Sequence, residues 1–484
     1  MEEETKSIKS RSIVSLVSLL LQSGYSAFLG LGANLALTIL LSPQIFGIYI
    51  TVLSLISLLN YFADIGLAAA LIQKKDITDD DIRTTFTIQQ LLVITIIIIG
   101  FLLSTPVQNF YHLPKEGVYL YWALLVSFFI SSAKTIPSVL LERKIQFQKV
   151  VFVQVVEDTT FYIIVSLLAF KGFGLYSFTY AVLFRAVIGL VLIYAISFWM
   201  PKVGVSKKSL KTLLSFGVPF QASSFLALFK DDLITLFLGK VLGFTGVGYV
   251  GWAKKWAEAP LRIIMDNVTR VLFPVISKLQ DNVEKVGLII DKLIYFQTAL
   301  LAPIMLASAF TMPKLIYFIP RYAKWSPAIP LFFIFVLSSF LVTYSAPFVY
   351  VFNALGKIKL SLIFMGIWTA MMWLLTPIMS AKFGYYGFPF VHLTVSLTFI
   401  FVVREAKKLF PLHLLPNIIP FITAAGAMAV ILYGSDLFLH TTNIFLLAGQ
   451  LATSGLIYLG ILFLFKINLV SEVIKLFKDR NVIV

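Results

Sequence analysis

Residues 247–277 read VGYVGWAKKWAEAPLRIIMDNVTRVLFPVIS, a stretch that is long enough to cross a bilayer and yet carries six formal charges. Five of these charges recur every fourth residue with alternating sign, at Lys254, Glu258, Arg262, Asp266 and Arg270. On an α-helix this spacing makes each charge the neighbour of the next, so opposite signs attract along one face. The stretch therefore predicts a helix with one charged and one apolar face.

A charge at the centre of a bilayer costs about 2.5–3.5 kcal/mol on insertion scales, so these side chains must face protein or water. We predict that this helix lines a wet, charged cavity inside a membrane transporter. The alternative is an amphipathic helix on the membrane surface, but alternating signs differ from the cationic face that anionic lipids attract. Pro260 predicts a central break or kink, which a cavity or a neighbouring helix would satisfy.

The composition of the whole chain is that of a membrane protein. Of its 484 residues, 59% are hydrophobic and only 13% are charged, whereas soluble domains carry about 25% charged residues. The chain has no cysteine, which excludes disulfides and thiolate chemistry, and its four histidines show no metal-ligand spacing. We therefore predict no metal site.

Apolar windows separated by short polar breaks predict an all-α polytopic membrane protein with about 14 transmembrane helices. The predicted spans lie near residues 14–41, 45–72, 84–105, 118–141, 150–170, 175–199, 213–239, 247–277, 287–312, 327–353, 358–380, 384–403, 416–434 and 443–465.

The distribution of basic residues predicts the orientation of the chain. If the N-terminus is cytoplasmic, 24 lysines and arginines lie at the inside ends and loops and only 7 lie outside. This asymmetry is the positive-inside pattern, so we expect both termini in the cytoplasm and the protein in the inner membrane. The net charge of +16 is explained in the same way, and we expect no nucleic acid partner.

A basic connection at 201–211 follows the sixth span and divides the chain into two six-helix halves. A short internal echo supports this division, because LSPQIFGIY at 41–49 precedes the second span and LGFTGVGYV at 242–250 precedes the eighth. Six helices per half keep the two repeats in the same orientation, as expected for lobes related by an axis along the membrane normal. We predict these lobes at 1–205 and 206–408.

The seventh span contains Lys230, Asp231 and Asp232 in the sequence FLALFKDDLITLFLG. Successive helical residues point about 100° apart, so the three side chains cannot all face one partner. These residues either serve the cavity or form ion pairs that pin neighbouring helices, and the sequence leaves both alternatives open.

The first lobe carries Lys134, Glu157, Asp158 and Arg185 inside predicted spans. Glu157 and Asp158 lie near the cytoplasmic end, where the side chain of a charged residue reaches the membrane surface. Arg185 has no other charge on its own helix and therefore needs a partner on another helix or on a ligand, for which phosphate or carboxylate is suited.

Asp64 is the only acid of the second span, and it is either an ion-coupling site or a cap of backbone amides before Gly66. The acids at Asp79, Asp80 and Asp81 follow a solvated connection and are expected to cap the next helix.

Enzymatic activity is not expected from this sequence. It contains no GxxxxGK[ST] loop, no GxSxG and no HExxH. A membrane-bound polymerase or transferase would need a sizeable outer loop with catalytic acids, and the predicted loops are too short.

Several segments resemble the oligosaccharide flippases of the Wzx type, in the polysaccharide transporter branch of the multidrug/oligosaccharidyl-lipid/polysaccharide superfamily. They are SPQIFGIY (42–49), FADIGLAAALIQ (62–73), SFGVPFQASSFLALFKDDLITLFLG (215–239), LGFTGVGYVGWAKK (242–255) and VLFPVISKLQ (271–280). Within this branch the chain is most similar to colanic-acid and teichuronic-acid exporters.

The resemblance implies two six-helix lobes around a central cavity, with two C-terminal accessory helices and a tail at 409–484. It also implies alternating access for an oligosaccharide linked to undecaprenyl pyrophosphate, bound in a cationic cavity. The candidate substrate ligands are Lys134, Arg185, Lys230, Lys254, Lys255, Arg262 and Arg270. Glu258 and Asp266 depart from this expectation, because they offset the positive charge.

No cofactor is expected, and the candidate energy sources are a proton gradient, a sodium gradient or downstream polymerisation. The candidate ion-coupling carboxylates are Asp64, Asp231, Asp232, Glu258 and Asp266. The expected partners are the bilayer, the lipid-linked oligosaccharide and the polymerase and chain-length proteins of the same pathway, with the transporter itself a monomer. The rival hypothesis is a cation-coupled drug or lipid II exporter of the same superfamily, although a cavity for cationic drugs should be dominated by acids.

Overall fold

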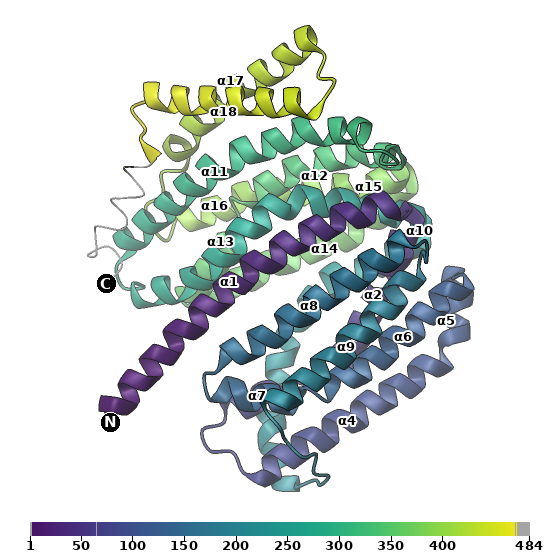
Figure 1. Cartoon of the computed structure of the whole chain (residues 1–484). Coiled ribbons are helices and arrows are strands. Elements are labelled where there is room, and N and C mark those ends of the chain that lie inside the picture. The colour runs from purple at the N-terminus through teal and green to yellow at the C-terminus, as the bar shows by residue number, and fades with distance from the viewer. Residues whose placement is uncertain (1, 64, 470, 472–484) are drawn as a thin grey trace. The chain divides into compact units, whose positions relative to one another are not determined.

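The computed structural model describes residues 2–63, 65–469 and 471, with the side chains of 2–17, 20, 220, 222–227, 230, 231, 266, 267, 269–271 and 274 left undescribed. Over the described residues the chain is helical and contains no β-strand, as the sequence predicts (Figure 1). The chain folds into two compact units, Met1–Gly251 and Trp252–Val484, which we call the N-unit and the C-unit.

Nine helices and the first part of a tenth make up the described part of the N-unit. They are α1 (Glu2–Leu40), α2 (Pro43–Ala63), α3 (Leu67–Gln73), α4 (Asp79–Leu102), α5 (Ser104–Tyr111), α6 (Lys115–Ser132), α7 (Thr135–Arg143), α8 (Phe147–Phe170), α9 (Tyr176–Ile196) and α10 (Lys207–Lys278). Within this unit α8 packs between α1 and α9, and α6 contacts α2, α4 and α9 (Figure 1).

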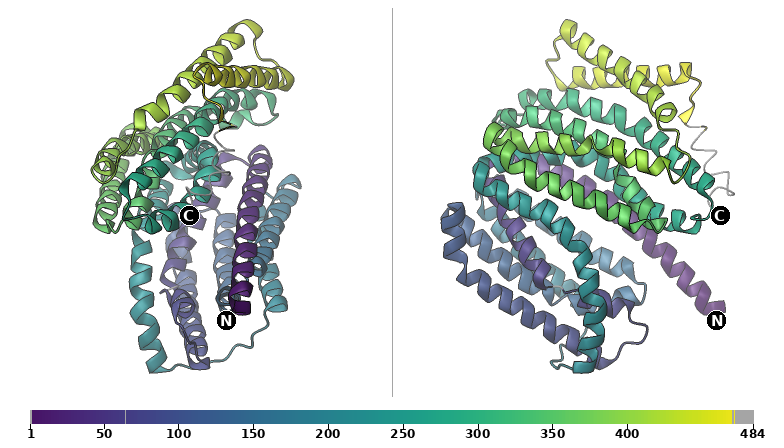
Figure 2. Two further views of the ribbon diagram at one scale, coloured as in Figure 1. Left: turned by 90° about the vertical axis from the view of Figure 1, so that its left-hand side faces the viewer. Right: turned by 180° about the vertical axis from the view of Figure 1, so that it is seen from behind.

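The C-unit begins inside α10 and continues through a second set of helices. They are α11 (Val283–Phe318), η1 (Ala323–Ala328), α12 (Ile329–Val342), α13 (Ala346–Ala354), α14 (Ile358–Phe383), η2 (Gly384–Tyr386), α15 (Gly387–Ser396), α16 (Phe399–Lys407), α17 (Leu414–Leu439) and α18 (Ile444–Leu464). Figure 2 shows α17 and α18, in yellow-green and yellow, beside each other, and both contact α11.

Among the described residues, eleven helical segments are long and apolar enough to cross a membrane. The pair α6 and α7, bent by 41° at its break, adds a twelfth if it is one span. Large apolar side chains are exposed along these helices, for example Leu102 (74%) and Phe170 (78%), as expected for surfaces that face lipid. The protein is therefore an all-α polytopic membrane protein, while the count of fourteen and the boundaries at 205 and 408 stay predictions.

The junction between the predicted seventh and eighth spans lies at Gly243. Within the described backbone of α10, this glycine alone has non-helical angles, with φ 66° and ψ 173°. A Cβ atom disfavours this conformation, so glycine is the residue that fits there. The predicted break at Pro260 is wrong, because α10 stays helical through it. A proline removes one backbone donor, and its fixed φ is close to that of a helix.

The two segments of the predicted internal echo pack against each other inside the N-unit. A Cβ added to Gly47 would lie 1.6 Å from the carbonyl oxygen of Phe244, and one added to Gly248 would lie 2.0 Å from that of Pro43. In the echo, Gly47 matches Gly248 and Pro43 matches Phe244. The two close approaches are therefore equivalent and reciprocal, which is the pattern that a two-fold relation produces.

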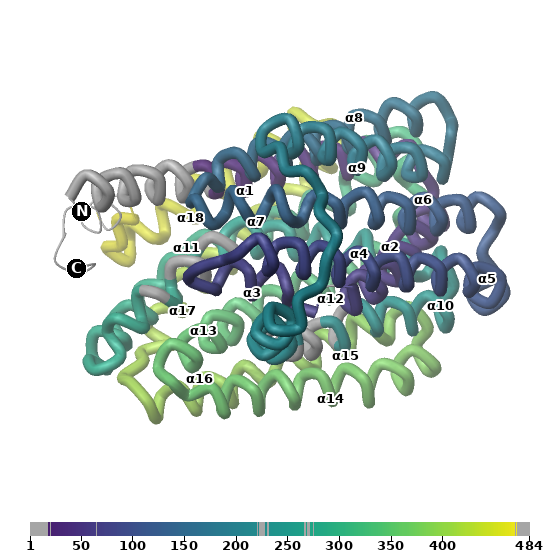
Figure 3. Tube along the Cα trace, turned by 90° about the horizontal axis from the view of Figure 1, so that it is seen from below, coloured from purple at the N-terminus to yellow at the C-terminus, as the bar shows by residue number. Residues whose placement is uncertain are grey.

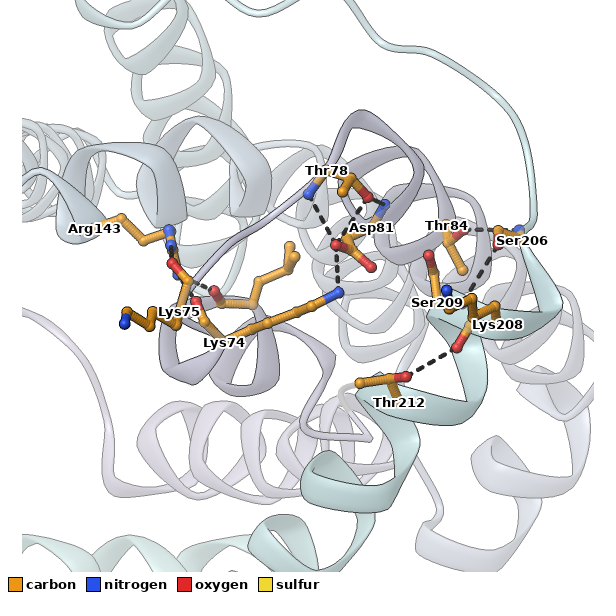
Figure 4. A network of polar contacts seen from close by, with 11 residues as sticks. Lys74, Lys75, Thr78, Asp81, Thr84, Arg143, Ser206, Lys208, Ser209 and Thr212 are labelled. Carbon is orange, nitrogen blue, oxygen red and sulfur yellow. Dashed lines mark hydrogen bonds and ion pairs between the residues drawn. The ribbon is translucent and has the colours of Figure 1, made fainter.

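The α3–α4 connection is held by a polar network (Figure 4). The backbone amide of Thr78 donates to the Asp81 carboxylate at 2.9 Å, and the amide of Asp81 donates to the Thr78 hydroxyl at 3.3 Å. The Lys74 amine lies 2.6 Å from the same carboxylate. The predicted cap of this helix is confirmed for Asp81, which pairs with Thr78 in a capping box.

Two further contacts tie neighbouring segments to this connection. Arg143, at the end of α7, donates to the carbonyl oxygens of Lys74 at 2.6 Å and Lys75 at 2.9 Å. The backbone amide of Ser206, just before α10, donates to the hydroxyl of Thr84 at 2.9 Å (Figure 4). Figure 3 shows the extended segment between α9 and α10 running across this end of the N-unit.

Candidate functional site

The charged face of α10 forms as predicted where its side chains are described. The amine of Lys254 lies 3.8 Å from one carboxylate oxygen of Glu258, and the guanidinium of Arg262 lies 2.9 Å from the other. Glu258 is 13% exposed and so lies between two cations that share its charge. Lys254 also lies 5.7 Å from the centre of the Phe388 ring, a cation–π contact within the C-unit.

Arg262 and Lys255 present positive charge at the surface of α10. The Arg262 side chain is 67% exposed, and Lys255 is exposed one residue after Lys254. These two residues are seven positions apart, which is close to two helical turns, so they lie on the same side of the helix. The side chains of Asp266 and Arg270, which complete the predicted series, lie outside the described residues.

Arg185 has the cross-helix partner that its isolation on α9 predicts. Its guanidinium donates to Asp158 on α8 at 2.8 Å, and the other oxygen of Asp158 accepts from the Ser26 hydroxyl on α1 at 3.2 Å. The Arg185 side chain is 46% exposed, and it lies 5.8 Å from the centre of the Phe161 ring. Asp158 therefore fixes the position of the guanidinium, while nearly half of the Arg185 side chain stays exposed.

Asp158 belongs to a line of polar contacts between α1 and α8. The Gln22 amide donates to Gln154 at 2.6 Å, and the hydroxyls of Tyr25 and Thr159 lie 2.8 Å apart. These contacts, which we call the polar seam, were not predicted from the sequence. Their signal is present in the sequence, because Gln22 and Ser26 on one helix and Gln154 and Asp158 on the other are each four residues apart.

Lys134 and Glu157 form an ion pair in the interior of the N-unit. Their side chains are 18% and 8% exposed. Gly189 on α9 makes room for the carboxylate, because a Cβ added there would lie 1.4 Å from Glu157 Oε1. The expectation that Glu157 reaches the membrane surface is therefore wrong, since the fold brings a lysine to it from the break between α6 and α7.

Of the acids in the seventh predicted span, Asp232 has a described side chain. It accepts a hydrogen bond from the Ser57 hydroxyl on α2 at 3.0 Å. Asp64 lies outside the described residues, as do the side chains of Lys230 and Asp231. No group of three or more His, Asp or Glu side chains in the described part of the chain is placed to hold a metal ion.

The described charges fall into two chemical classes. Lys134 is neutralised by a buried carboxylate, which suits it to hold helices together. Arg185, Lys255 and Arg262 have exposed side chains, and a guanidinium can bind phosphate or carboxylate oxygens in a bidentate manner. Exposed cations of this kind can bind an anion.

Curated relatives resemble the chain over parts of their length. The succinoglycan biosynthesis transport protein ExoT of Rhizobium meliloti (strain 1021) is 22% identical over 321 residues, which are 66% of this chain and 64% of ExoT. The lipopolysaccharide biosynthesis protein WzxC of Escherichia coli (strain K12) is 24% identical over 313 residues, 62% of this chain and 61% of WzxC. The chain thus matches slightly less than two thirds of the length of each of these relatives.

A solved structure shows the fold, and a family model shows the family. The lipid II flippase MurJ, in an inward closed conformation, matches 94% of this chain and 98% of its own with a TM-score of 0.73 at 15% identity, a likeness of fold. The family model described as polysaccharide biosynthesis protein matches residues 36–330, more than half of the chain, and the protein therefore belongs to this family.

Proposed function

We propose that this protein is a flippase that moves undecaprenyl-pyrophosphate-linked oligosaccharide repeat units from the cytoplasmic to the outer leaflet for export of a cell-surface polysaccharide. The observation that carries the proposal is the exposed positive charge of Lys255 and Arg262 on a helix with the length and hydropathy of a membrane span. Such charges are costly in lipid and mark substrate pathways. Membership of a polysaccharide biosynthesis family supports an anionic, lipid-linked glycan as the substrate.

The mechanism follows from the cost of carrying a pyrophosphate through hydrocarbon. Lys255 and Arg262 of the C-unit hold the pyrophosphate in a cavity while the prenyl tail stays in lipid, and Arg185 of the N-unit is a further candidate ligand. Alternating access then opens this cavity first to the cytoplasm and afterwards to the outer side. The reaction is transport, and no covalent bond is made or broken.

A cation gradient is the proposed energy source. Glu258, which lies 3.8 Å from Lys254 and 2.9 Å from Arg262, is the first described candidate for proton or sodium coupling. Asp232, with its Ser57 hydrogen bond, is the second described candidate for proton or sodium coupling. Asp64, Asp231 and Asp266 complete the proposed set.

We place the protein in the inner membrane as a monomer with both termini in the cytoplasm, beside the polymerase and chain-length proteins that consume its product. The rival proposal is export of lipid II or of a cationic drug. Exposed cations favour an anionic substrate over a cationic drug. Lipid II also carries a pyrophosphate, so only a transport assay with both lipids separates the two glycolipid substrates.

The test is transport by the purified protein in proteoliposomes, with leaflet exposure of a fluorescent lipid-linked oligosaccharide read by an impermeant glycosidase. Arg185→Ala combined with Arg262→Ala should lower the rate at least about tenfold, because a hydrogen bond to a charged group contributes about 1.5–3 kcal/mol. Lys359→Ala with Arg404→Ala is the matched control, because both are exposed cations, in the first turn of α14 and the last turn of α16.

Three outcomes decide the proposal. Wild-type transport of the oligosaccharide lipid, with little transport of lipid II, supports it. Unchanged transport by the Arg185/Arg262 variant rejects the cationic site, provided that the variant unfolds at the wild-type temperature. Preferential transport of lipid II favours the rival substrate.

A further inference from the structure

A pocket of about 630 Å³ lies in the N-unit between the first turns of α2 and α6 and the turn that joins α8 to α9. Figure 1 shows these connections at the same end of the unit. The polar lining comes from Gln44, Glu116 and Lys171, and the aromatic lining comes from Phe173 and Tyr176. The volume lies within the range of about 300–1,000 Å³ that is usual for small-molecule sites. None of these residues belongs to the charged groups described above.

The pocket brings both signs of charge together without pairing them. None of the ion pairs among the described residues includes Glu116 or Lys171. Glu116 lies in the first turn of α6, where the helix dipole favours an acid. The helix dipole explains why an acid occurs at Glu116. It does not explain why Lys171 and Gln44 line the same pocket. A carboxylate accepts hydrogen bonds, an ammonium donates them, and an amide does both.

Tyr176 connects the pocket to a row of aromatic side chains. Its ring lies 6.1 Å from that of Tyr119, stacked at 29°, and 6.5 Å from that of Tyr180. Tyr119 in turn lies 5.7 Å from Trp122. Rows of this kind also occur where helices leave the membrane, with the rings at the headgroups. A membrane-interface role explains the exposed Trp122 and Tyr180, but it does not require Tyr176 to line a pocket with unpaired charges.

We infer that this pocket binds one hexose ring of the oligosaccharide on the outer side of the membrane, an inference that rests on the proposed function. A hexopyranose has an apolar C–H face that packs on a tyrosine ring and hydroxyls that both donate and accept hydrogen bonds. Tyr176 supplies the ring, Glu116 and Gln44 accept from hydroxyls, and Lys171 donates to them. These are the groups that line the pocket.

The position of the pocket in the chain fits this ligand. Its walls are the connections that follow the first, third and fifth predicted spans, and the predicted orientation places all three outside the cell. The pocket is thus distinct from the proposed pyrophosphate site and receives the glycan after translocation. It holds the sugar while the lipid carrier leaves the cavity.

The experiment is saturation-transfer difference NMR on the full chain in nanodiscs, with cellobiose, N,N′-diacetylchitobiose and glucuronic acid as soluble probes. At least one probe should receive saturation at its ring C–H protons. Tyr176→Ala should weaken this binding about tenfold, the loss of an aromatic contact of about 1.4 kcal/mol. Glu116→Gln, which keeps the shape of the side chain, should weaken it as well. Tyr350→Ala, an exposed tyrosine of the C-unit, is the matched control and should bind as the wild type does.

The outcomes separate this inference from the proposed function. Binding of none of the three probes, or equal binding by the wild type and the Glu116→Gln and Tyr176→Ala variants, overturns the inference while lipid transport by the same preparation still supports the function. Probe binding that depends on Tyr176 and Glu116, in a protein that moves no lipid-linked oligosaccharide, keeps the sugar pocket and overturns the function. Glu116→Gln decides the matter if Tyr176→Ala does not fold.

Discussion

At the scale of single residues, intramembrane charges divide by what surrounds them. The sequence identifies Lys134 and Arg185 as charged residues inside spans, but their exposures of 18% and 46% depend on which helices pack beside them. The sequence predicts that Arg185 needs a partner and cannot name it, because Asp158 is 27 residues away on another helix. The Lys254–Glu258–Arg262 series was predictable, because its partners are four residues apart on one helix.

We predict that Lys134 is a structural residue. Lys134→Ala leaves the buried Glu157 without its cation, and breaking a buried pair in this way costs about 3–5 kcal/mol of stability. The thermal unfolding temperature of the purified protein should fall, and it should partly recover in the double variant Lys134→Ala with Glu157→Gln. Lys359→Ala, at an exposed lysine, should unfold as the wild type does. An unchanged unfolding temperature with loss of transport would instead return Lys134 to the substrate site that its position in the sequence predicts.

At the scale of helices, the decisive contact is between the first turn of α2 and α10 just after Gly243. Both sides use a glycine against a backbone carbonyl, which a helix can approach only where no Cβ intervenes. In the sequence, the two sides of this contact are visible as a similarity between two nine-residue segments. In the structure, these two segments pack against each other in a reciprocal way. The polar seam between α1 and α8 was missed, because the register of two helices follows from their packing and not from either sequence alone.

Gly47→Ala tests this contact. The added Cβ would lie 1.6 Å from the Phe244 carbonyl oxygen, and backbone cannot rotate away as a side chain can, so overpacking should destabilise the protein by about 1–3 kcal/mol or more. The yield of folded protein and the unfolding temperature should both fall. Gly460→Ala is the matched control, since nothing lies within 4 Å of a Cβ there. Wild-type yield, unfolding temperature and transport in Gly47→Ala would show that the helices do not approach this closely.

At the scale of the whole molecule, composition predicts the class of protein, and local sequence features predict where one helix ends and the next begins. The apolar fraction indicates an all-α membrane protein, and the glycine-rich segment at 242–250 marks the junction within α10. The seventh predicted span, at 213–239, belongs to the same compact unit as the first six. No local pattern in the sequence indicates this grouping, because it follows from contacts between distant helices. The pocket of the N-unit could not be predicted from the sequence either, because three connections far apart in sequence build it.

The central claim is that Lys255 and Arg262 face water inside the membrane, and cysteine accessibility tests it most directly. The chain has no cysteine, so single replacements at Lys255, Arg262 and the apolar, 45% exposed Ile263 need no background correction. Adjacent helical residues point about 100° apart, so Ile263 is the matched control on another side of α10. In vesicles of both orientations, an impermeant thiol reagent should label Lys255→Cys and Arg262→Cys and leave Ile263→Cys unlabelled. Protection of all three positions in both orientations would contradict the account.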